Sequence, residues 1–428
     1  MTRPLPPLSL YVHLPWCVRK CPYCDFNSHE QRGELPEQAY VTALLADLEA
    51  AAESAQGRSL ASVFIGGGTP SLFSAAAIAR LLDGVAARVP LAADAEITLE
   101  ANPGTAEHGR FRGYRAAGVN RLSLGVQSFQ PQRLRALGRI HDEHEARRAI
   151  GQALECFGRV NLDLMYALPG QTVEEAQADC EIAVTSGATH LSFYQLTIEP
   201  NTVFHRQPPE LPDEETAVAI EEAVHGRLAR AGFARYEVSA WSRPGEECRH
   251  NLNYWRFGDY LGIGAGAHAK ITTPAGIARE ARSRGAGAAQ RPAAPARAGA
   301  GRGGGARAAG APATTPPRAG WAGVARWGAR AVSGRRAAQA GAVAERRDVA
   351  GAEAVFEFML NALRLTGGFP EKLLAERTGQ ALAAAEPGLS TAIERGLLTR
   401  GRGEIRPTGL GLRYLNDLTA LFLPEQPR

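Results

Sequence analysis

The stretch Leu8–Phe26 has the sequence LSLYVHLPWCVRKCPYCDF, a β-rich run followed directly by three closely spaced cysteines. Cys17, Cys21 and Cys24 are separated by three and two residues. Three thiolates at this spacing can bind three irons of a cubane cluster and leave the fourth iron without a protein ligand. A fourth cysteine would instead make the cluster a simple electron carrier. The spacing therefore predicts a [4Fe–4S] cluster with one iron open to a small molecule.

A structural zinc site is the alternative for these three cysteines. Such a site needs a fourth ligand, usually from a second pair of ligands at short spacing. The other cysteines are remote from one another, and Cys248 with His250 is the only candidate partner. This use of cysteine also suits a reducing compartment better than a disulfide framework, so we expect a cytoplasmic protein.

Outward from this stretch, β-rich runs alternate with helical segments such as Glu37–Ala52 and Glu174–Thr185. The runs are Leu8–Leu14, Ser62–Ile65, Glu96–Glu100, Arg121–Leu124, Val160–Met165 and Leu191–Leu196. Alternating strands and helices predict crossover units and a parallel sheet. We therefore expect an α/β fold built as a partial (β/α)6 barrel, with a doubly wound open sheet as the alternative.

Polar or glycine-rich residues stand at or just after the ends of four of these runs. They are Gly66-Gly67-Gly68-Thr69-Pro70, Glu100, Gly125-Val126-Gln127-Ser128 and Asp163. The carboxyl ends of parallel barrel strands meet on one face, where barrel enzymes carry out their chemistry. The pattern therefore predicts a functional site on that face, beside the three cysteines.

The composition is that of an ordinary globular protein, with 45% hydrophobic and 21% charged residues in a chain of 428. A net charge of +4 gives no indication of nucleic-acid binding. The chain contains no uninterrupted apolar run long enough for a transmembrane helix, and its first residues do not resemble a secretory signal. We divide it into a barrel domain at 1–272, an atypical segment at 273–350 and a C-terminal domain at 351–428.

The atypical segment is rich in Ala, Gly, Arg and Pro, and the window 281–340 contains no Leu, Ile, Asp or Glu. Such a composition cannot bury enough apolar surface to offset the entropy cost of ordering. We expect the segment to be disordered, or to be the product of a compensated frameshift in GC-rich coding. A basic tether for nucleic acid or anionic lipid is a weaker alternative.

The C-terminal domain is predicted to contain helices and one hairpin. Helical segments at Val355–Leu365, Pro370–Arg377 and Leu389–Arg395 precede a hairpin from Leu397–Arg400 to Glu404–Arg406, and Thr408–Leu415 begins a last helix. This order is typical of a winged-helix-like module. The arginines around the hairpin are too few to indicate DNA binding. A docking or lid domain is the better interpretation.

A set of motifs, in order along the chain, resembles the radical S-adenosylmethionine (SAM) superfamily, and specifically its coproporphyrinogen oxidase/HemW branch. The motifs are YVHLPWC, CPYCDF, FIGGGTPS, LEANPG, LSLGVQSF, NLDLMYALPGQT, FYQLTIEPNT, HNLNYW and FEFMLNALRL. The resemblance covers Leu8–Ala269 and Ala352–Leu415. It implies that SAM chelates the open iron through its amino and carboxylate groups, and that an electron from the cluster cleaves SAM to a 5′-deoxyadenosyl radical.

The resemblance also implies roles for single residues. Tyr11, Gly67 and Glu100 match positions that contact the cluster-bound SAM. In the coproporphyrinogen oxidases a second SAM lies next to the first. The positions that contact it are occupied here by Tyr23, Gly68, Thr69, Gln127, Arg139 and Asp163. His13 is expected to lie next to the cluster ligands and to support them, not to bind iron itself.

Two functions are compatible with this branch: oxygen-independent coproporphyrinogen III oxidase, and a chaperone that binds haem and delivers it to apo-haemoproteins. Three features favour the chaperone. Phe26 occupies the place of the fourth cysteine in the oxidase pattern CxxxCxxCxC, and the cluster strand already begins at Leu8, without the oxidases' N-terminal extension. His250–Trp255, HNLNYW, matches the HNxxYW motif of the chaperone group. We expect a chaperone without coproporphyrinogen oxidase activity.

His250 is the candidate haem-binding residue, because imidazole is a suitable ligand for haem iron. Trp255 could pack against a porphyrin face. The alternative for this motif is a hydrogen-bonded turn that packs onto the barrel. The expected partners are haem and apo-haemoproteins, including membrane respiratory enzymes reached from the inner face of the membrane, with no nucleic acid; the oligomeric state stays open.

Overall fold

The structure, a computed structural model, describes residues 4–104, 108–285 and 343–424. Its centre is a 12-stranded sheet, in which neighbouring strands from β11 to β8 run parallel. The parallel strands are β1 Leu8–Leu14, β4 Leu60–Gly67, β5 Leu91–Ala101, β6 Arg121–Gln127, β7 Arg159–Tyr166, β8 His190–Gln195 and β11 Asp259–Ile263. The six strands predicted from the sequence are thus confirmed as β1 and β4 to β8.

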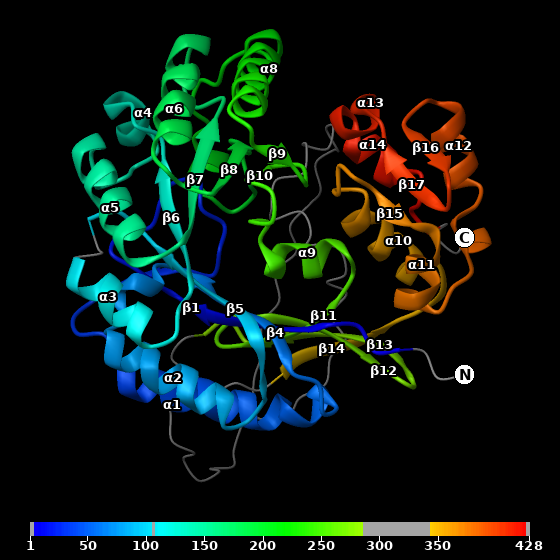
Figure 1. Ribbon diagram of the computed structural model, residues 1–428, viewed down its shortest axis with the longest axis horizontal. Helices are drawn as coiled ribbons and strands as arrows, with labels where there is room; N and C mark the ends of the chain where they lie inside the picture. The colour runs from blue at the N-terminus through cyan, green and yellow to red at the C-terminus, as the bar shows by residue number, and fades with distance from the viewer. Residues whose placement is uncertain (1–3, 105–107, 286–342, 425–428) are drawn as a thin grey trace, which may run out of the picture.

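The order of the strands in space decides between the two predicted folds. From β1 to β8 the parallel strands follow one another in the sheet as they do in the chain. Because parallel crossovers are right-handed, a sequential order places all the connecting helices on one face, whereas a doubly wound sheet reverses its order. Figure 1 shows the helices along the outer side of the curved sheet. The partial barrel is therefore confirmed.

Several of the covering helices begin at a side-chain cap. The covering helices are α1 Glu37–Ala51, α2 Ala75–Ala86, α3 His108–Ala116, α4 Pro131–Ala136, α5 Glu143–Cys156, α6 Val173–Thr185 and α8 Glu214–Arg230. Asp142 caps α5 and Thr172 caps α6, each in a reciprocal capping box with the glutamate three residues later. Each strand alternates between the helix-covered face, which carries residues such as Leu10 and Val63, and the barrel interior.

Beyond β11 the sheet continues with antiparallel strands, β12 His268–Thr273, β13 Gly276–Arg282 and β14 Val343–Val349. The prediction of a structureless segment at 273–350 is therefore wrong at both of its ends, where β13 and β14 pair with each other. Residues 286–342 lie outside the described residues. Apart from Ala281 and Arg282, both strands lie outside the window 281–340. Arg279 of β13 and Arg347 of β14 form ion pairs with Glu357 of the C-terminal domain.

At the opposite end of the sheet, β8 pairs antiparallel with β10 Ala240–Ser242, which pairs with β9 Ala234–Arg235. The short helices α7 Val203–Arg206 and α9 Arg249–Trp255 connect these strands to their neighbours. Helix α9 contacts β1 and β4 from inside the barrel and reaches α10 of the C-terminal domain. Figure 1 shows α9 between the barrel and that domain.

The C-terminal domain contains the predicted helices and hairpin. Its elements are α10 Gly351–Ala362, β15 Phe369–Pro370, α11 Glu371–Thr378, α12 Gly388–Glu394, β16 Leu398–Gly401, β17 Glu404–Pro407, α13 Gly409–Arg413 and α14 Leu415–Ala420. Phe358, Met359, Leu374 and Ile405 are buried in its own core. The last predicted helix is divided into α13 and α14, because Tyr414 leaves the helical region with φ −107° and ψ 43°.

Candidate cofactor site

The three cysteines lie on the loop that follows β1, which we define as the cluster loop (residues 15–30). Its two ends pair as the short strands β2 Trp16–Cys17 and β3 His29–Glu30. The ammonium of Lys20 donates hydrogen bonds to the carbonyls of Phe26 and Ser28, both at 3.0 Å. The loop is therefore closed on itself by backbone pairing and by one lysine.

His13 fastens the cluster loop to β1. Burial lowers the pKa of His13 to about 4, so the ring is neutral. Its Nε2 lies 2.9 Å from the carbonyl oxygen of Asn27 and donates to it, and Nδ1 then accepts from the Tyr11 hydroxyl at 3.0 Å. The predicted SAM contact Tyr11 is thus oriented by a residue that also holds the cluster loop.

The three thiols fit an iron–sulfur cluster. All three are free and half-buried on one loop. Burial raises the pKa of the Cys17 thiol and raises that of Cys24 to about 11, and coordination to iron would favour the thiolate. The Arg139 guanidinium lies 3.7 Å from the Cys21 sulfur and would stabilise its negative charge. Within the described ranges, no three His, Cys, Asp or Glu side chains gather closely enough for a single metal ion.

Gly67 and Glu100 meet beside the loop. The amide of Gly67 donates to Glu100 Oε2 at 3.1 Å. Gly67 has φ +114°, and a Cβ there would lie 2.6 Å from the His13 ring, so only glycine fits. Burial, with a contribution from the charge of Asp163, raises the pKa of Glu100 to about 8. The carboxyl group is therefore held in a site that favours its protonation until a cationic partner such as an amino group arrives.

Gly68, Thr69 and Arg139 form a second group beside the first. A Cβ on Gly68 would lie 2.5 Å from the carbonyl oxygen of Trp16, which again leaves room only for glycine. Asn102 joins the other two, because its amide nitrogen donates to the Thr69 hydroxyl at 2.9 Å and its oxygen accepts from Arg139 at 2.6 Å. Arg139 also donates to the carbonyl of Gly125.

The remaining predicted SAM contacts lie on β6, β7 and the cluster loop. Asp163 accepts hydrogen bonds from Ser123 and Asn161, both at 2.9 Å, and burial raises its pKa. Gln127, in a left-handed conformation with φ 70°, accepts from the Tyr194 hydroxyl at 2.7 Å. Burial raises the pKa of the Tyr23 hydroxyl, and the positive charge of the neighbouring Arg139 opposes this rise. These side chains therefore meet on the face of the sheet that carries the cluster loop.

A cavity of about 30 Å³ opens beside Cys21. Its lining residues are Val18, Arg19, Cys21, Thr69, Asn102, Pro103, Gly138, Arg139, Ile140 and His141. Asn102 and His141 were missed by the sequence interpretation. Asn102 could have been found, because it follows Glu100 by two residues in the motif LEANPG. His141 lies between α4 and α5, away from the strand ends, so no sequence pattern marked it as a site residue.

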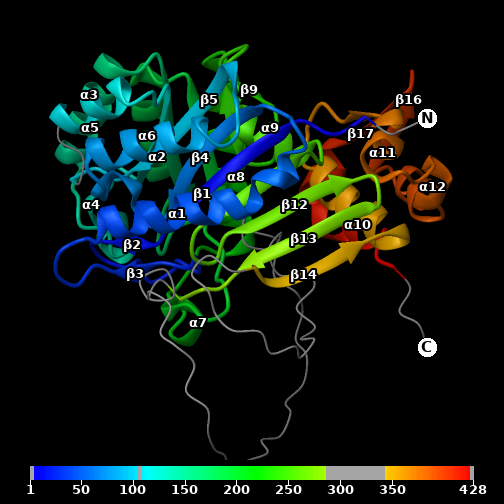
Figure 2. The same cartoon turned by 90° about the horizontal axis from the view of Figure 1, so that it is seen from below.

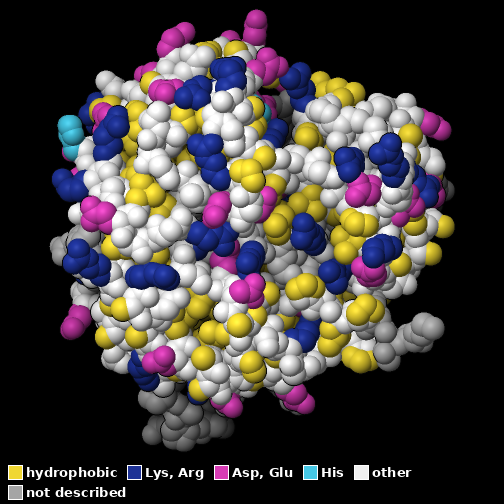
Figure 3. All heavy atoms as spheres, in the orientation of Figure 1, with side chains coloured by type: hydrophobic (Ala, Val, Ile, Leu, Met, Phe, Trp, Pro, Cys, Tyr) yellow, Lys and Arg dark blue, Asp and Glu magenta, His cyan; other side chains and the backbone are white. Residues whose placement is uncertain are grey.

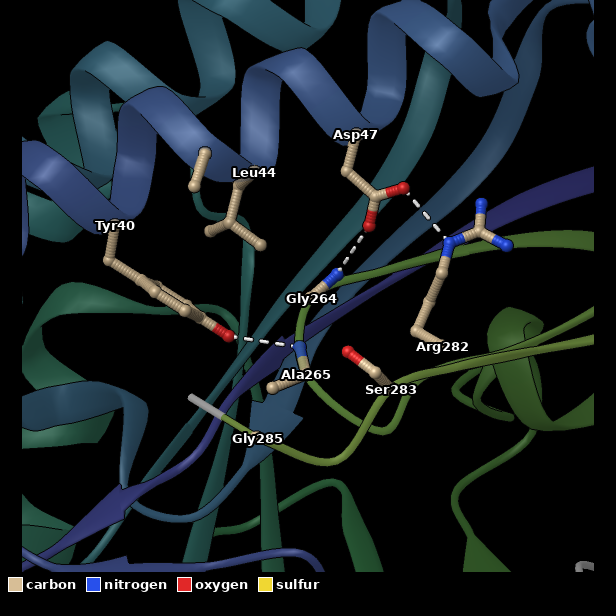
Figure 4. Close-up of a pocket in the computed structure, with 9 residues that line it drawn as sticks. Tyr40, Leu44, Asp47, Gly264, Ala265, Arg282, Ser283 and Gly285 are labelled. Atoms are coloured by element: carbon tan, nitrogen blue, oxygen red, sulfur yellow. Dashed lines mark hydrogen bonds and ion pairs between the residues drawn. The ribbon is translucent and has the colours of Figure 1, made fainter. Parts of the chain in front are cut away.

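A smaller cavity of about 10 Å³ lies between α1, the turn after β11 and the end of β13 (Figure 4). Asp47 accepts from the amide of Gly264 and from Arg282 Nε, each at 2.9 Å. The hydroxyl of Tyr40 accepts from the Ala265 amide at 3.1 Å. These bonds fasten the turn after β11, and the carbonyl of Ala265 in turn accepts from Asn27 of the cluster loop at 2.9 Å. The cavity therefore belongs to the support of the loop.

His250 lies inside the barrel, 2% exposed, with the ring of Phe64 between it and Tyr11. Its Nδ1 is 2.9 Å from the hydroxyl of Ser62, and its Nε2 is 3.2 Å from that of Tyr254. The ring stacks on Phe64 with centroids 5.0 Å apart, and burial lowers its pKa to about 3. Neither nitrogen is open to a haem iron in this conformation.

Asn253 and Trp255 of the HNLNYW motif are also held against neighbouring residues. Asn253 donates to Ser9 Oγ at 3.0 Å and to the carbonyl of Asp259 at 2.8 Å. Trp255, 4% exposed, lies under the guanidinium of Arg364, which is 4.4 Å from its ring centroid. The arrangement corresponds to the alternative interpretation, a hydrogen-bonded turn packed onto the barrel.

Comparisons with known proteins assign the chain to a family. Residues 11–183 match the model of the radical SAM superfamily, and residues 349–414 match that of the HemN C-terminal domain. The chain is 46% identical to the haem chaperone HemW of Escherichia coli over 98% of this chain and 99% of that protein. It is 42% identical to HemW of Haemophilus influenzae over 99% of both chains.

Among solved structures, coproporphyrinogen III oxidase HemN from Escherichia coli has a similar fold. The TM-score is 0.73 with 21% identity, over 98% of this chain and 90% of that one. At this identity the likeness concerns the fold, including the partial barrel and the C-terminal domain. The sequence matches along nearly the whole chain go further: the protein belongs to the radical SAM superfamily and, within it, to the HemW family.

Proposed function

We propose that this chain is a [4Fe–4S]- and SAM-binding haem chaperone, which binds haem and delivers it to apo-haemoproteins. The observation that carries the proposal is the identity of 46% and 42% to two proteins named haem chaperones, over nearly the full length of all three chains. The oxidase with the same fold shares 21%. Phe26, at the place of the oxidases' fourth cysteine, supports the same choice.

The cofactors implied by the family fit the residues of the cluster face. We propose that Cys17, Cys21 and Cys24 hold the cluster. When bound, the cluster supplies one-electron chemistry and an iron that the amino and carboxylate groups of SAM can chelate. Tyr11, Gly67 and Glu100 are the proposed contacts of this SAM, and Glu100 would accept a hydrogen bond from its amino group.

A second SAM would lie on the neighbouring group of side chains. Its proposed contacts are Tyr23, Gly68, Thr69, Gln127, Arg139 and Asp163. Arg139 is suited to orient a carboxylate, because its guanidinium is already fixed by Asn102 and the carbonyl of Gly125. Asp163 is held by two hydrogen bonds and could accept a further one from a ribose hydroxyl or an amino group.

We propose that residues 1–272 form the SAM domain and 351–428 a docking or lid domain, with the protein acting in the cytoplasm and delivering haem at the inner face of the membrane. In the described parts of the chain, no helix is both long and apolar enough to cross a membrane. On the face shown in Figure 3, basic and acidic side chains are interspersed, in keeping with the net charge of +4.

The test is haem binding and transfer by the anaerobically reconstituted full-length protein. Loaded with haem and mixed with an apo-haemoprotein, it should bind haem stoichiometrically and restore the recipient's spectrum. The same preparation, given SAM, a reductant and coproporphyrinogen III, should form no vinyl product. Robust conversion of the porphyrinogen without haem transfer would contradict the proposal and establish the oxidase.

A further inference from the structure

Exposed apolar side chains gather around the cluster loop. In the described residues between 4 and 285, the exposed large hydrophobic side chains are Val18, Phe26, Ile140 and Val203, with exposed fractions of 46, 50, 52 and 44%. Single exposed hydrophobic residues are common on protein surfaces, whereas a group of them beside a functional site marks a contact surface. We call these four residues the collar.

The four residues lie on segments that touch one another. Val18 and Phe26 belong to the cluster loop itself, and Val18 lines the cavity beside Cys21 together with Ile140. Gly138, two residues before Ile140, packs so closely on Pro22 that a Cβ there would lie 2.8 Å from the proline ring. The turn between α4 and α5 therefore flanks the cluster loop.

Helix α7 flanks the loop as well. The amide of Phe204 donates to the carbonyl of Pro22 at 3.0 Å, and the Phe204 ring lies 6.3 Å from that of Tyr23. Figure 2 shows α7 at the same end of the molecule as β2 and β3, which bound the cluster loop. Val203, which precedes Phe204, is thereby placed at the edge of the same face.

The collar has an unpaired cation. Arg19 is exposed, lines the same cavity as Val18 and Ile140, and forms no ion pair or hydrogen bond with the residues that the structure describes. The other cation of the cavity, Arg139, is already bonded to Asn102 and Gly125. The cavity lining contains no Asp or Glu. The rim of this cavity thus combines the apolar side chains of Val18 and Ile140 with a cation that has no partner among the described residues, and it suits a flat apolar anion.

We propose that haem docks on the collar, with its macrocycle against Val18 and Ile140 and one propionate on Arg19. The inference rests on the proposed function, whose cargo is haem, and locates that cargo outside the sealed position of His250. Haem combines an apolar macrocycle with two carboxylates at one edge, which matches the charge and polarity of this surface. An acidic patch on a recipient protein is the competing occupant.

The test compares haem with its dimethyl ester, which lacks the propionate charges. Cluster-loaded full-length protein is titrated with each, and binding is followed by quenching of tryptophan fluorescence. Ile140→Asp should weaken the binding of both ligands about tenfold, the equivalent of one lost apolar or charge-assisted contact. Arg19→Gln should weaken haem by a similar factor and leave the ester unchanged. Leu410→Asp, at a 49% exposed position on α13, is the matched control and should bind like the parent protein.

Iron and acid-labile sulfide must equal the parent values in every variant, so that a lost cluster is not mistaken for a lost haem site. Unchanged haem affinity in both collar variants overturns the collar proposal and leaves the proposed function standing. Unchanged affinity together with lost transfer to an apo-haemoprotein overturns it in favour of the recipient-protein surface. A parent protein that binds no haem refutes the proposed function itself.

Discussion

The cluster face and the α9 region both carry buried polar and aromatic side chains, and both come from motifs that stand out in the sequence. The two regions differ in whether their characteristic groups are open to a ligand. On the cluster face three thiols are free, Glu100 is held with a raised pKa and Arg19 has no described partner. In α9, both ring nitrogens of His250 are hydrogen-bonded to hydroxyl groups, and the Asn253 amide nitrogen donates to two oxygens of neighbouring strands. Free thiols and a buried carboxyl group with a raised pKa beside a cavity indicate a site, whereas a buried histidine with both ring nitrogens hydrogen-bonded indicates a structural joint.

The largest effect should come from the cluster loop. Cys21→Ala removes one of three thiolates, and the remaining two cannot hold the cubane, so iron and sulfide should fall to near zero after reconstitution. Cys156→Ala, which removes a half-buried thiol at the end of α5, is the matched control and should keep the parent content. A full cluster in Cys21→Ala would contradict the assignment of the loop.

The α9 joint should respond through stability. His250→Ala removes the ring partner of the Tyr254 hydroxyl, leaves the Ser62 hydroxyl with Ser9 alone and creates a cavity against Phe64. The free energy of unfolding should fall by roughly 2–4 kcal/mol, measured by urea denaturation.

His250→Asn provides the control for that variant. The asparagine amide can still donate toward Ser62, so the loss should be smaller than with alanine. If both variants were as stable as the parent protein, α9 would not be a structural joint.

Glu100 should make stability depend on pH. Its pKa is raised to about 8 in the folded protein, so between about pH 5 and 8 the folded state holds a proton that the unfolded state has released. The free energy of unfolding of SAM-free protein should therefore fall as the pH rises through this window, by on the order of 1–3 kcal/mol. Asp163, whose pKa burial also raises, should add to the slope.

Glu100→Gln, which cannot ionise, should flatten that pH dependence while weakening SAM binding. The slopes are compared by urea denaturation of both proteins at several pH values. Equal slopes would mean that Glu100 is ionised in the SAM-free protein and that its site is less enclosed than the contacts indicate.

The smallest effect should come from the exposed link between α13 and α8. Arg413 lies 2.8 Å from Glu222, but both side chains are largely exposed, at 49 and 64%. Arg413→Ala should change the free energy of unfolding by less than about 1 kcal/mol. A larger loss in thermal denaturation would indicate that this contact, and not α9, joins the C-terminal domain to the barrel.

Much of this arrangement follows from local sequence. The six strands were predictable because β-rich runs alternate with helical segments, and the cluster face because Gly67, Glu100 and Asp163 mark strand ends. The enclosure of His250 could not be predicted, because its partner Ser62 is 188 residues away in the chain. The strands β13 and β14 were not predictable either, because their pairing joins parts of the chain on either side of the Ala/Gly/Arg/Pro-rich window.

The most direct test of the difference between the two regions is a haem titration of cluster-loaded His250→Asn beside the parent protein. If the cluster face handles haem and α9 is a joint, the two dissociation constants should agree within about twofold, the equivalent of less than half a kcal/mol. A dissociation constant at least tenfold weaker in the variant, with the cluster content unchanged and the protein fully folded at the titration temperature, would contradict the account and make His250 a haem ligand.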